Sequence, residues 1–514
     1  MTLVLQARGH MELAILTNVV SLFFGQLTNV REHSLDIPYG KQVSVISSVN
    51  PSVNQSEARH ASRSGTSDRY VTVTTTKRLQ IQKGAWQEAD TVSEYLPLHD
   101  ARRALKRQLY IILSRETQIE FPWGALTGVR PTQIALKVIR QVAKQTRQPD
   151  QIKTRAVSEL IEHWHLSAPK AHLAVETALA EQTILSRIEK QDALLYVGLP
   201  FCPSRCLYCS FITQDAKRHS ASLGNYVEAV IKESQGVFQE GFKKRIAAVY
   251  YGGGTPTSLP APLFHRYLQG VLAAAPLGDD AERTMEAGRP DTIDREKLEI
   301  IQAFGFHKIC INPQTMHNDT LDRIGRGHTA EDTLKAFQLA RSMGFDEINM
   351  DLIAGLPGEG ATELLDTLNR VIELGPENIT LHTLAVKKGS YLDRLLVGRD
   401  AFLPDKALID AVEQAHALLR EHGYAPYYLY RQQNCRSGLE NTGFTRRGRG
   451  SLYNVAMMSD QVPVIGLGSG ATSKRIEGGK AKRLHNPKDL LVYMDRVDDL
   501  IVKKRALFSP QAIL

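Results

Sequence analysis

An alternation of short apolar runs with helical patterns, which begins near Ala193, constrains the fold of this chain more than any other feature. Strands that alternate with helices favour a parallel sheet of the α/β class. Six such units predict most of a barrel, a partial (β/α)6 barrel, in which the loops after the strands build the active site. The candidate strands are 194–198, 247–251, 284–287, 308–311, 348–353 and 379–384.

The 514-residue chain is long enough for two or three domains. We predict an N-terminal α/β and helical region over 1–190, the partial barrel over 191–400, and a C-terminal α+β extension over 401–514. The extension mixes helical patterns with a strand-like run at 427–430 and a glycine-rich segment at 466–471.

The N-terminal region has its own pattern. One strand-like run begins at Val43 and a second covers residues 70–81. The polar stretch 50–68 between the two runs is predicted to be a mobile loop. From Ser93 onward the pattern is predicted to be helical, with leucines recurring at a spacing of four. The segment 121–132 (FPWGALTGVRPT) is rich in Gly and Pro, which indicates a structured loop.

Three of the five cysteines follow the first candidate strand, in the segment 196–211 (YVGLPFCPSRCLYCSF). Cys202, Cys206 and Cys209 have the spacing C-x3-C-x2-C. Three thiolates on a tight loop can hold a 4Fe–4S cluster and leave one of its irons open. The open iron can chelate the amino and carboxylate groups of S-adenosylmethionine (SAM). One electron from the cluster then cleaves the sulfonium to give methionine and a 5′-deoxyadenosyl radical.

Structural zinc is the alternative interpretation of these cysteines. Such zinc sites usually have a fourth ligand, often in a second C-x2-C pair, and this chain has no such pair. Cys310 and Cys435 stand alone in the sequence. We expect both to be small buried hydrophobic residues.

Glycines and polar residues follow the later strands, at the ends where a barrel keeps its site. The segment 251–256 (YGGGTP) follows the second strand, and its glycines allow close approach of the backbone to a ligand such as the SAM amino group. Glu286 ends the third strand and can accept hydrogen bonds from ribose hydroxyls. The remaining candidates after the fourth and fifth strands are Gln314, Arg326 and Asp351.

Composition narrows the environment and the partners. The net charge is +8, but no dense basic run with interleaved aromatics indicates nucleic-acid binding. We expect most of these basic residues to lie on an ordinary solvated surface. The alternative is that some of them form a site for an acidic substrate. No apolar stretch reaches the roughly 18 residues of a membrane span, and no signal peptide is recognisable. The sparse cysteines indicate a reducing environment, so we expect a cytoplasmic protein.

The motifs resemble the oxygen-independent coproporphyrinogen III oxidase family, and in particular its HemZ-type branch. The resemblance rests on the cysteine loop, the YGGGTP segment, residues 349–358 (NMDLIAGLPG) and residues 382–390 (HTLAVKKGS). The extra N-terminal region, residues 121–132 and residues 427–434 (YYLYRQQN) resemble the HemZ-type branch. The resemblance covers most of the chain.

The resemblance implies a radical SAM barrel with a HemN-like C-terminal extension and an oxidoreductase of haem (porphyrin) biosynthesis. Such an enzyme would oxidatively decarboxylate coproporphyrinogen III to protoporphyrinogen IX without oxygen, using an electron donor such as flavodoxin or ferredoxin. Ala385 and Thr472 match positions that contact a second SAM in the decarboxylase. By motif position, the residues implied to line the first SAM site are Tyr196, Tyr208, Gly253, Gly254, Thr255, Glu286, Gln314, Arg326 and Asp351.

Three positions depart from the related sequences. Phe211 stands where the decarboxylase has a fourth cysteine, as in the haem-chaperone branch, and Gly198 stands where the decarboxylase has a His. The stretch 440–445 (ENTGFT) lacks the His of the His-Asn-x-x-Tyr-Trp motif of the chaperone branch. Two other functions therefore stay open: a haem chaperone, and a radical SAM methyltransferase acting on a tetrapyrrole.

Overall fold

Six parallel strands form the centre of an eleven-stranded sheet in the computed structural model. Each strand overlaps one predicted from the sequence, and neighbours along the chain are neighbours in the sheet. The first of them is buried along almost its whole length, which is the reason that it reads as an apolar run. The strands are β7 (Asp192–Leu199), β10 (Arg245–Gly253), β11 (Leu277–Glu286), β12 (Lys308–Cys310), β13 (Glu347–Ala354) and β14 (Asn378–Thr383).

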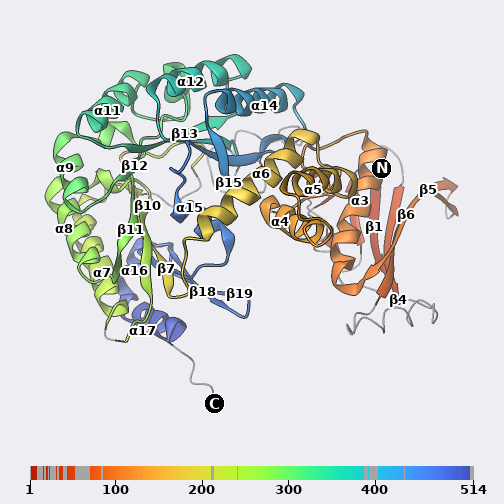
Figure 1. Cartoon of the computed structure of the whole chain (residues 1–514), viewed down its shortest axis with the longest axis horizontal. Helices are drawn as coiled ribbons and strands as arrows, with labels where there is room; N and C mark the ends of the chain where they lie inside the picture. The colour runs from red at the N-terminus through yellow and green to blue at the C-terminus, as the bar shows by residue number, and fades with distance from the viewer. Residues whose placement is uncertain are drawn as a thin grey trace.

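Helices cover the outer face of the curved sheet (Figure 1). Their apolar residues pack with those of the strands in the largest hydrophobic core of the molecule. This arrangement is the predicted partial barrel. The covering helices are α7 (Ser220–Val237), α8 (Ala261–Leu272), α9 (Arg295–Ala303), α10 (Asn318–Arg323), α11 (Ala330–Ser342), α12 (Ala361–Leu374) and α14 (Lys406–Glu421).

The sheet continues beyond the six central strands on both sides. β15 (Ala425–Arg431) and β16 (Glu440–Thr445) extend it antiparallel beyond β14. β17 (Val464–Leu467) pairs parallel with β7 at the other side, and β18 (Thr472–Glu477) and β19 (Lys480–His485) follow it. The expected boundary at residue 400 therefore does not coincide with an edge of the sheet.

The structure describes residues 2–8, 16, 19–20, 22–23, 30–31, 34–38, 43–51, 70–82, 85–128, 130–209, 214–239, 241–386, 392, 403–432 and 435–509. Within these ranges, no helix combines the length and the apolar character needed to cross a membrane. Phe211 and most of the predicted mobile loop, residues 52–68, lie outside them. The remaining short elements of the barrel half are β8 (Phe201–Cys202), β9 (Gln214–Asp215), η3 (Pro256–Ser258), η4 (Pro290–Thr292), η6 (Arg436–Gly438), α15 (Leu452–Ser459), α16 (Leu490–Asp495) and α17 (Val497–Phe508).

A second sheet lies apart from the barrel, with three helices between the two (Figure 1). Its strand order is β2-β3-β1-β4-β5-β6, and helix α3 (Ala101–Thr117) packs on it. The strands are β1 (Thr2–Arg8), β2 (Val30–Arg31), β3 (Ser34–Pro38), β4 (Val43–Pro51), β5 (Tyr70–Gln82) and β6 (Ala85–Pro97). The intervening helices are α4 (Pro131–Val142), α5 (Pro149–Trp164) and α6 (Ala168–Leu185).

The prediction that the chain turns helical at Ser93 is wrong. Ser93 lies in β6 opposite Thr74, and the α-helix begins only at Ala101, after the short helix η2 (Leu98–Asp100). Exposure alternates with a period of two near the end of β6, which is the mark of a strand with one face covered. The leucines spaced by four belong to a helix, α3, as predicted, and all three are buried there.

A buried ionic cluster joins the helical region to the barrel sheet. Glu440, at the start of β16, accepts a hydrogen bond from Trp123 Nε1 at 2.6 Å and pairs with Lys170 of α6 at 2.5 Å. Lys170 also pairs with Glu413 of α14 at 2.6 Å, and its side chain is fully buried. The segment 121–132, predicted to be a structured loop, precedes and enters α4. Through Trp123 it attaches the helical region to the barrel sheet.

Candidate active site

A cavity of about 660 Å³ lies within the barrel. It is lined by residues of the central strands and of the loops that follow them, as expected for a barrel enzyme. The structure brings all the predicted site residues to this one cavity: Tyr196, Cys202, Cys206, Tyr208, Cys209, Gly253, Gly254, Thr255, Glu286, Gln314, Arg326, Asp351, Ala385 and Thr472.

Backbone hydrogen bonds hold the cysteine loop in place. Cys209 N donates to Cys206 O at 3.1 Å, which makes the turn, and Leu207 N donates to Ile324 O at 2.9 Å. Cys202 Sγ lies 3.4 Å from Thr255 Oγ1, so the first cysteine contacts the glycine-rich segment.

The chemistry of the three thiols suits a bound iron cluster. Burial, together with the charges of Cys209 and Cys206, raises the pKa of Cys202 to about 12. Buried thiols that repel one another as thiolates become good ligands when cations are placed between them. Cationic irons would supply that compensation, so the donor set fits the group.

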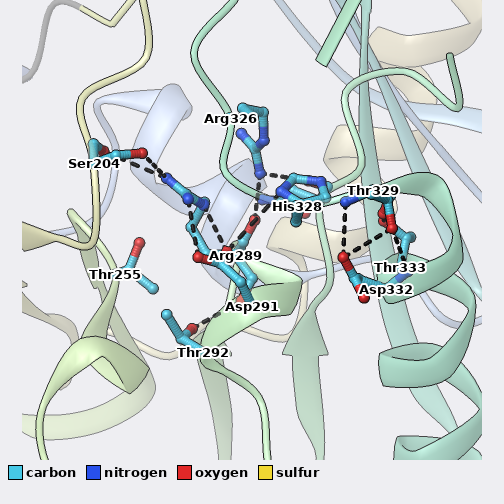
Figure 2. Close-up of polar contacts among 12 residues, drawn as sticks. Ser204, Thr255, Arg289, Asp291, Thr292, Arg326, His328, Thr329, Asp332 and Thr333 are labelled. Carbon is cyan, nitrogen blue, oxygen red and sulfur yellow. Dashed lines mark hydrogen bonds and ion pairs between the residues drawn. The ribbon is translucent and has the colours of Figure 1, made fainter. Parts of the chain in front are cut away.

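Two buried arginines lie beside the cysteine loop (Figure 2). Arg289 Nη1 donates to Ser204 Oγ at 3.0 Å, and its other nitrogens pair with Asp291. Arg326 donates to Tyr208 OH at 2.9 Å. Burial, followed by the charges of Arg326 and Arg289, lowers the pKa of His328 to about 3, so His328 is neutral. The arginines place fixed positive charge beside the cysteine loop, and the charge of Arg289 opposes the rise in the pKa of Cys202.

The glycine-rich segment needs glycine for steric reasons. Gly253 has a φ of +103°, and a Cβ on Gly254 would lie 2.3 Å from Phe201 O. The amides of Gly253, Gly254 and Thr255 all donate within the protein, to Glu286, Leu199 and Phe201 respectively. This segment can therefore offer a ligand amino group carbonyl oxygens, which accept hydrogen bonds.

Two half-buried carboxylates, Glu286 and Asp351, line the same cavity. Burial, together with the negative charge of Asp351, raises the pKa of Glu286 to about 8. Burial opposes ionisation of Asp351 too, but its contact with His382 and a hydrogen bond from Asn349 keep its pKa below the ordinary value. A cationic ligand would relieve this repulsion, and the sulfonium of SAM is a cation.

Gln314 offers the cavity an unused acceptor. It has a φ of +70°, and its backbone bridges the ends of two strands through Asp351 O and Ile353 N. Its Oε1 is buried and has no hydrogen-bond partner within the described part of the chain. A buried acceptor without a partner is costly, so a donor on a bound ligand would be stabilising here.

His382 is a cavity residue that sequence analysis did not select. Asn441 Oδ1 accepts a hydrogen bond from Thr383 N, so the His382 Nδ1 that lies 3.1 Å from this oxygen carries a proton. His382 Nε2 faces Asp351 Oδ2 at 3.8 Å, and Tyr430 OH lies 3.5 Å from Nδ1. His382 could have been found from the sequence, because a polar residue at an alternate position of an otherwise apolar strand is expected to face the barrel interior.

Comparison with known proteins adds independent findings. The sequence profile of the Radical SAM superfamily matches residues 196–371. The oxygen-independent coproporphyrinogen-III oxidase-like protein HemZ of Bacillus subtilis is 36% identical over 400 residues, covering 75% of this chain and 77% of that protein. The heme chaperone HemW of Escherichia coli is 33% identical over 234 residues, covering 45% and 60% respectively.

A solved structure shares the fold. Coproporphyrinogen III oxidase (HemN) from Escherichia coli, a radical SAM enzyme, matches with a TM-score of 0.50 and 24% sequence identity. The match covers 63% of this chain and 73% of that chain.

Proposed function

This chain belongs to the HemZ-like family of radical SAM proteins, which use a 4Fe–4S cluster and SAM, and on that premise we propose that it oxidises coproporphyrinogen III to protoporphyrinogen IX. Each reacting propionate would lose a hydrogen atom, carbon dioxide and an electron, which leaves a vinyl group. The observation that carries the proposal is the cavity that gathers the three cysteines with the eleven other predicted residues.

The cysteine loop would hold the cluster, through Cys202, Cys206 and Cys209. When bound, the cluster and SAM supply a one-electron cleavage that produces a hydrogen-abstracting group. Tyr208 is held by Arg326 on the cavity wall and would position the ligand beside the cluster.

The strand-end residues would orient SAM. Glu286 and Gln314 offer oxygen acceptors from two neighbouring strand ends, and the carbonyl groups of the Gly253–Gly254 segment offer others. Asp351 stays ionised through His382 and Asn349 and would stabilise the positive charge of the ligand. Ala385 also lines the cavity and would contact bound SAM.

The test is product analysis under strict anaerobiosis. Protein with a reconstituted cluster is incubated with SAM, a reductant and coproporphyrinogen III, and the tetrapyrrole is analysed by mass spectrometry. We expect successive loss of carbon dioxide and two hydrogens from two side chains, and no loss with the Cys206→Ala variant. SAM cleavage without a decarboxylated product would contradict the oxidase function.

Haem trafficking is the second candidate, favoured by the 33% identity over 234 residues to the heme chaperone HemW. It predicts stoichiometric haem binding, visible in the absorption spectrum, and transfer of haem to an apo-protein. Haem titration of the same anaerobic preparation distinguishes the two functions, because the oxidase requires turnover of SAM and the chaperone does not.

A further inference from the structure

A short basic turn, residues Asp215–His219, is attached directly to the first cysteine. β9 pairs with β8, so that Asp215 lies opposite Cys202, and Ala216 N donates to Cys202 O at 2.9 Å. Asp215 Oδ1 accepts hydrogen bonds from the backbone amides of Lys217 at 2.9 Å and Arg218 at 3.1 Å. The turn is therefore held in a fixed position beside the loop that carries the thiols.

The outward side of the turn is positively charged. Lys217 and Arg218 are exposed, and the Arg218 side chain is 84% accessible. Arg205, between the first two cysteines, is exposed as well. Asp215 is the single acidic residue between Cys202 and His219. Its Oδ1 accepts from the amides of the turn, and its Oδ2 lies 3.9 Å from Arg218 Nε, so it offsets one of the three cations and leaves a net positive charge.

Exposed lysines and arginines usually do no more than contact solvent. These are distinguished by where they lie, because the proposed reductive cleavage of SAM consumes an electron that must reach the cluster from outside. A protein that delivers it has to approach the cysteine loop closely. The basic turn is an exposed surface that is hydrogen-bonded to that loop through Ala216 and Cys202.

We propose that the basic turn, together with Arg205, is the docking surface for an acidic redox protein that reduces the cluster. The inference rests on the proposed radical SAM function and adds to it the place where the electron donor makes contact. In the docked complex the partner is oxidised by one electron and the cluster is reduced by one, and no atom is transferred.

The physical role of the turn is to steer a transient encounter. Complementary charges raise the association rate of two proteins and are screened by salt. Electron-transfer partners form small, weak contacts, so a few cations beside the redox centre are sufficient to orient them. A large apolar interface is not required.

The experiment compares two reductants on the same cluster-loaded protein. Cleavage of SAM is measured as methionine formed, first with reduced acidic flavodoxin and then with excess dithionite, a small reductant that needs no protein docking. The variant Lys217→Glu/Arg218→Glu should lower the flavodoxin-driven rate about tenfold or more at low salt. Its dithionite-driven rate should equal that of the wild type, and the flavodoxin difference should shrink as salt rises.

A matched control makes the same charge change elsewhere. Lys153 and Arg155 are exposed on α5 of the helical region, and Lys153→Glu/Arg155→Glu should leave both rates unchanged. A milder variant, Lys217→Gln/Arg218→Gln, should give an intermediate loss with flavodoxin and serves if the reversed charges disturb folding.

The outcomes separate the two proposals. An unchanged flavodoxin rate in the Lys217→Glu/Arg218→Glu variant would overturn the docking surface, as would equal losses with both reductants or equal losses in the α5 control. Failure of the wild type to cleave SAM with dithionite would instead refute the radical SAM function on which the docking surface depends.

Discussion

The protonation of Glu286 should control the affinity for SAM. Its pKa is raised to about 8 by burial and by the charge of Asp351, so the free protein at neutral pH holds Glu286 mostly as the neutral acid. A carboxylate accepts hydrogen bonds through both oxygens and attracts a cationic ligand, whereas the neutral acid does so less well. SAM should therefore bind more tightly as the pH rises through about 8.

The magnitude follows from this pKa. At the pKa half of the sites carry the carboxylate, and two pH units lower only about 1% do. If SAM binds the ionised form alone, its affinity should fall about 50-fold from pH 8 to about pH 6. The direction follows from the raised pKa of Glu286: the carboxylate that binds SAM forms above this pKa, so the affinity for SAM is gained as the pH rises and lost as it falls.

The assay is equilibrium binding of SAM to the cluster-loaded protein across this range, with Glu286→Gln as the reference. Titration of SAM itself affects both proteins and cancels in the ratio of their dissociation constants. The Asp351→Asn variant should move the midpoint of the profile to lower pH, because the charge that raises the Glu286 pKa is gone. A ratio that changes less than about threefold over the range would refute the reasoning.

Three further predictions test the loop, the buried cluster and the glycine segment. Cys206→Ala should abolish the brown colour and the bound iron and sulfide, because two thiolates rarely retain a cubane. Lys170→Met should lower the free energy of unfolding by about 3–5 kcal/mol, measured by urea denaturation, since it leaves a buried carboxylate unpaired. Adding Glu440→Gln should restore part of that loss. Gly254→Ala should weaken SAM binding about tenfold or more, because its Cβ would meet a backbone oxygen at 2.3 Å. Gly224→Ala, which meets no atom within 4 Å, is the matched control.

The central strands could be predicted because their pattern is local. Each is a short apolar run that pairs with the next strand along the chain, and periodicity reports such elements directly. β17 was not predicted as a strand of this sheet. It is only four residues long, begins a glycine-rich segment and pairs with β7, which lies far away in the sequence.

The same limit applies to the polar residues around the site. Glu440 partners Trp123 and Lys170, which are 317 and 270 residues away, and no periodicity connects positions so distant. His382 was visible in a motif, but its contact with Asp351 depends on the pairing of β13 with β14.

The sequence by itself was enough to predict the cluster ligands, because Cys202, Cys206 and Cys209 lie on one loop and their spacing allows three thiolates to converge. The tertiary structure decided what surrounds them. It set the charge state of Glu286, the acceptor offered by Gln314, and the placement of Arg289 and Arg326 beside the thiols. Burial and electrostatic neighbours depend on which strand ends meet, and that is established only when the barrel packs.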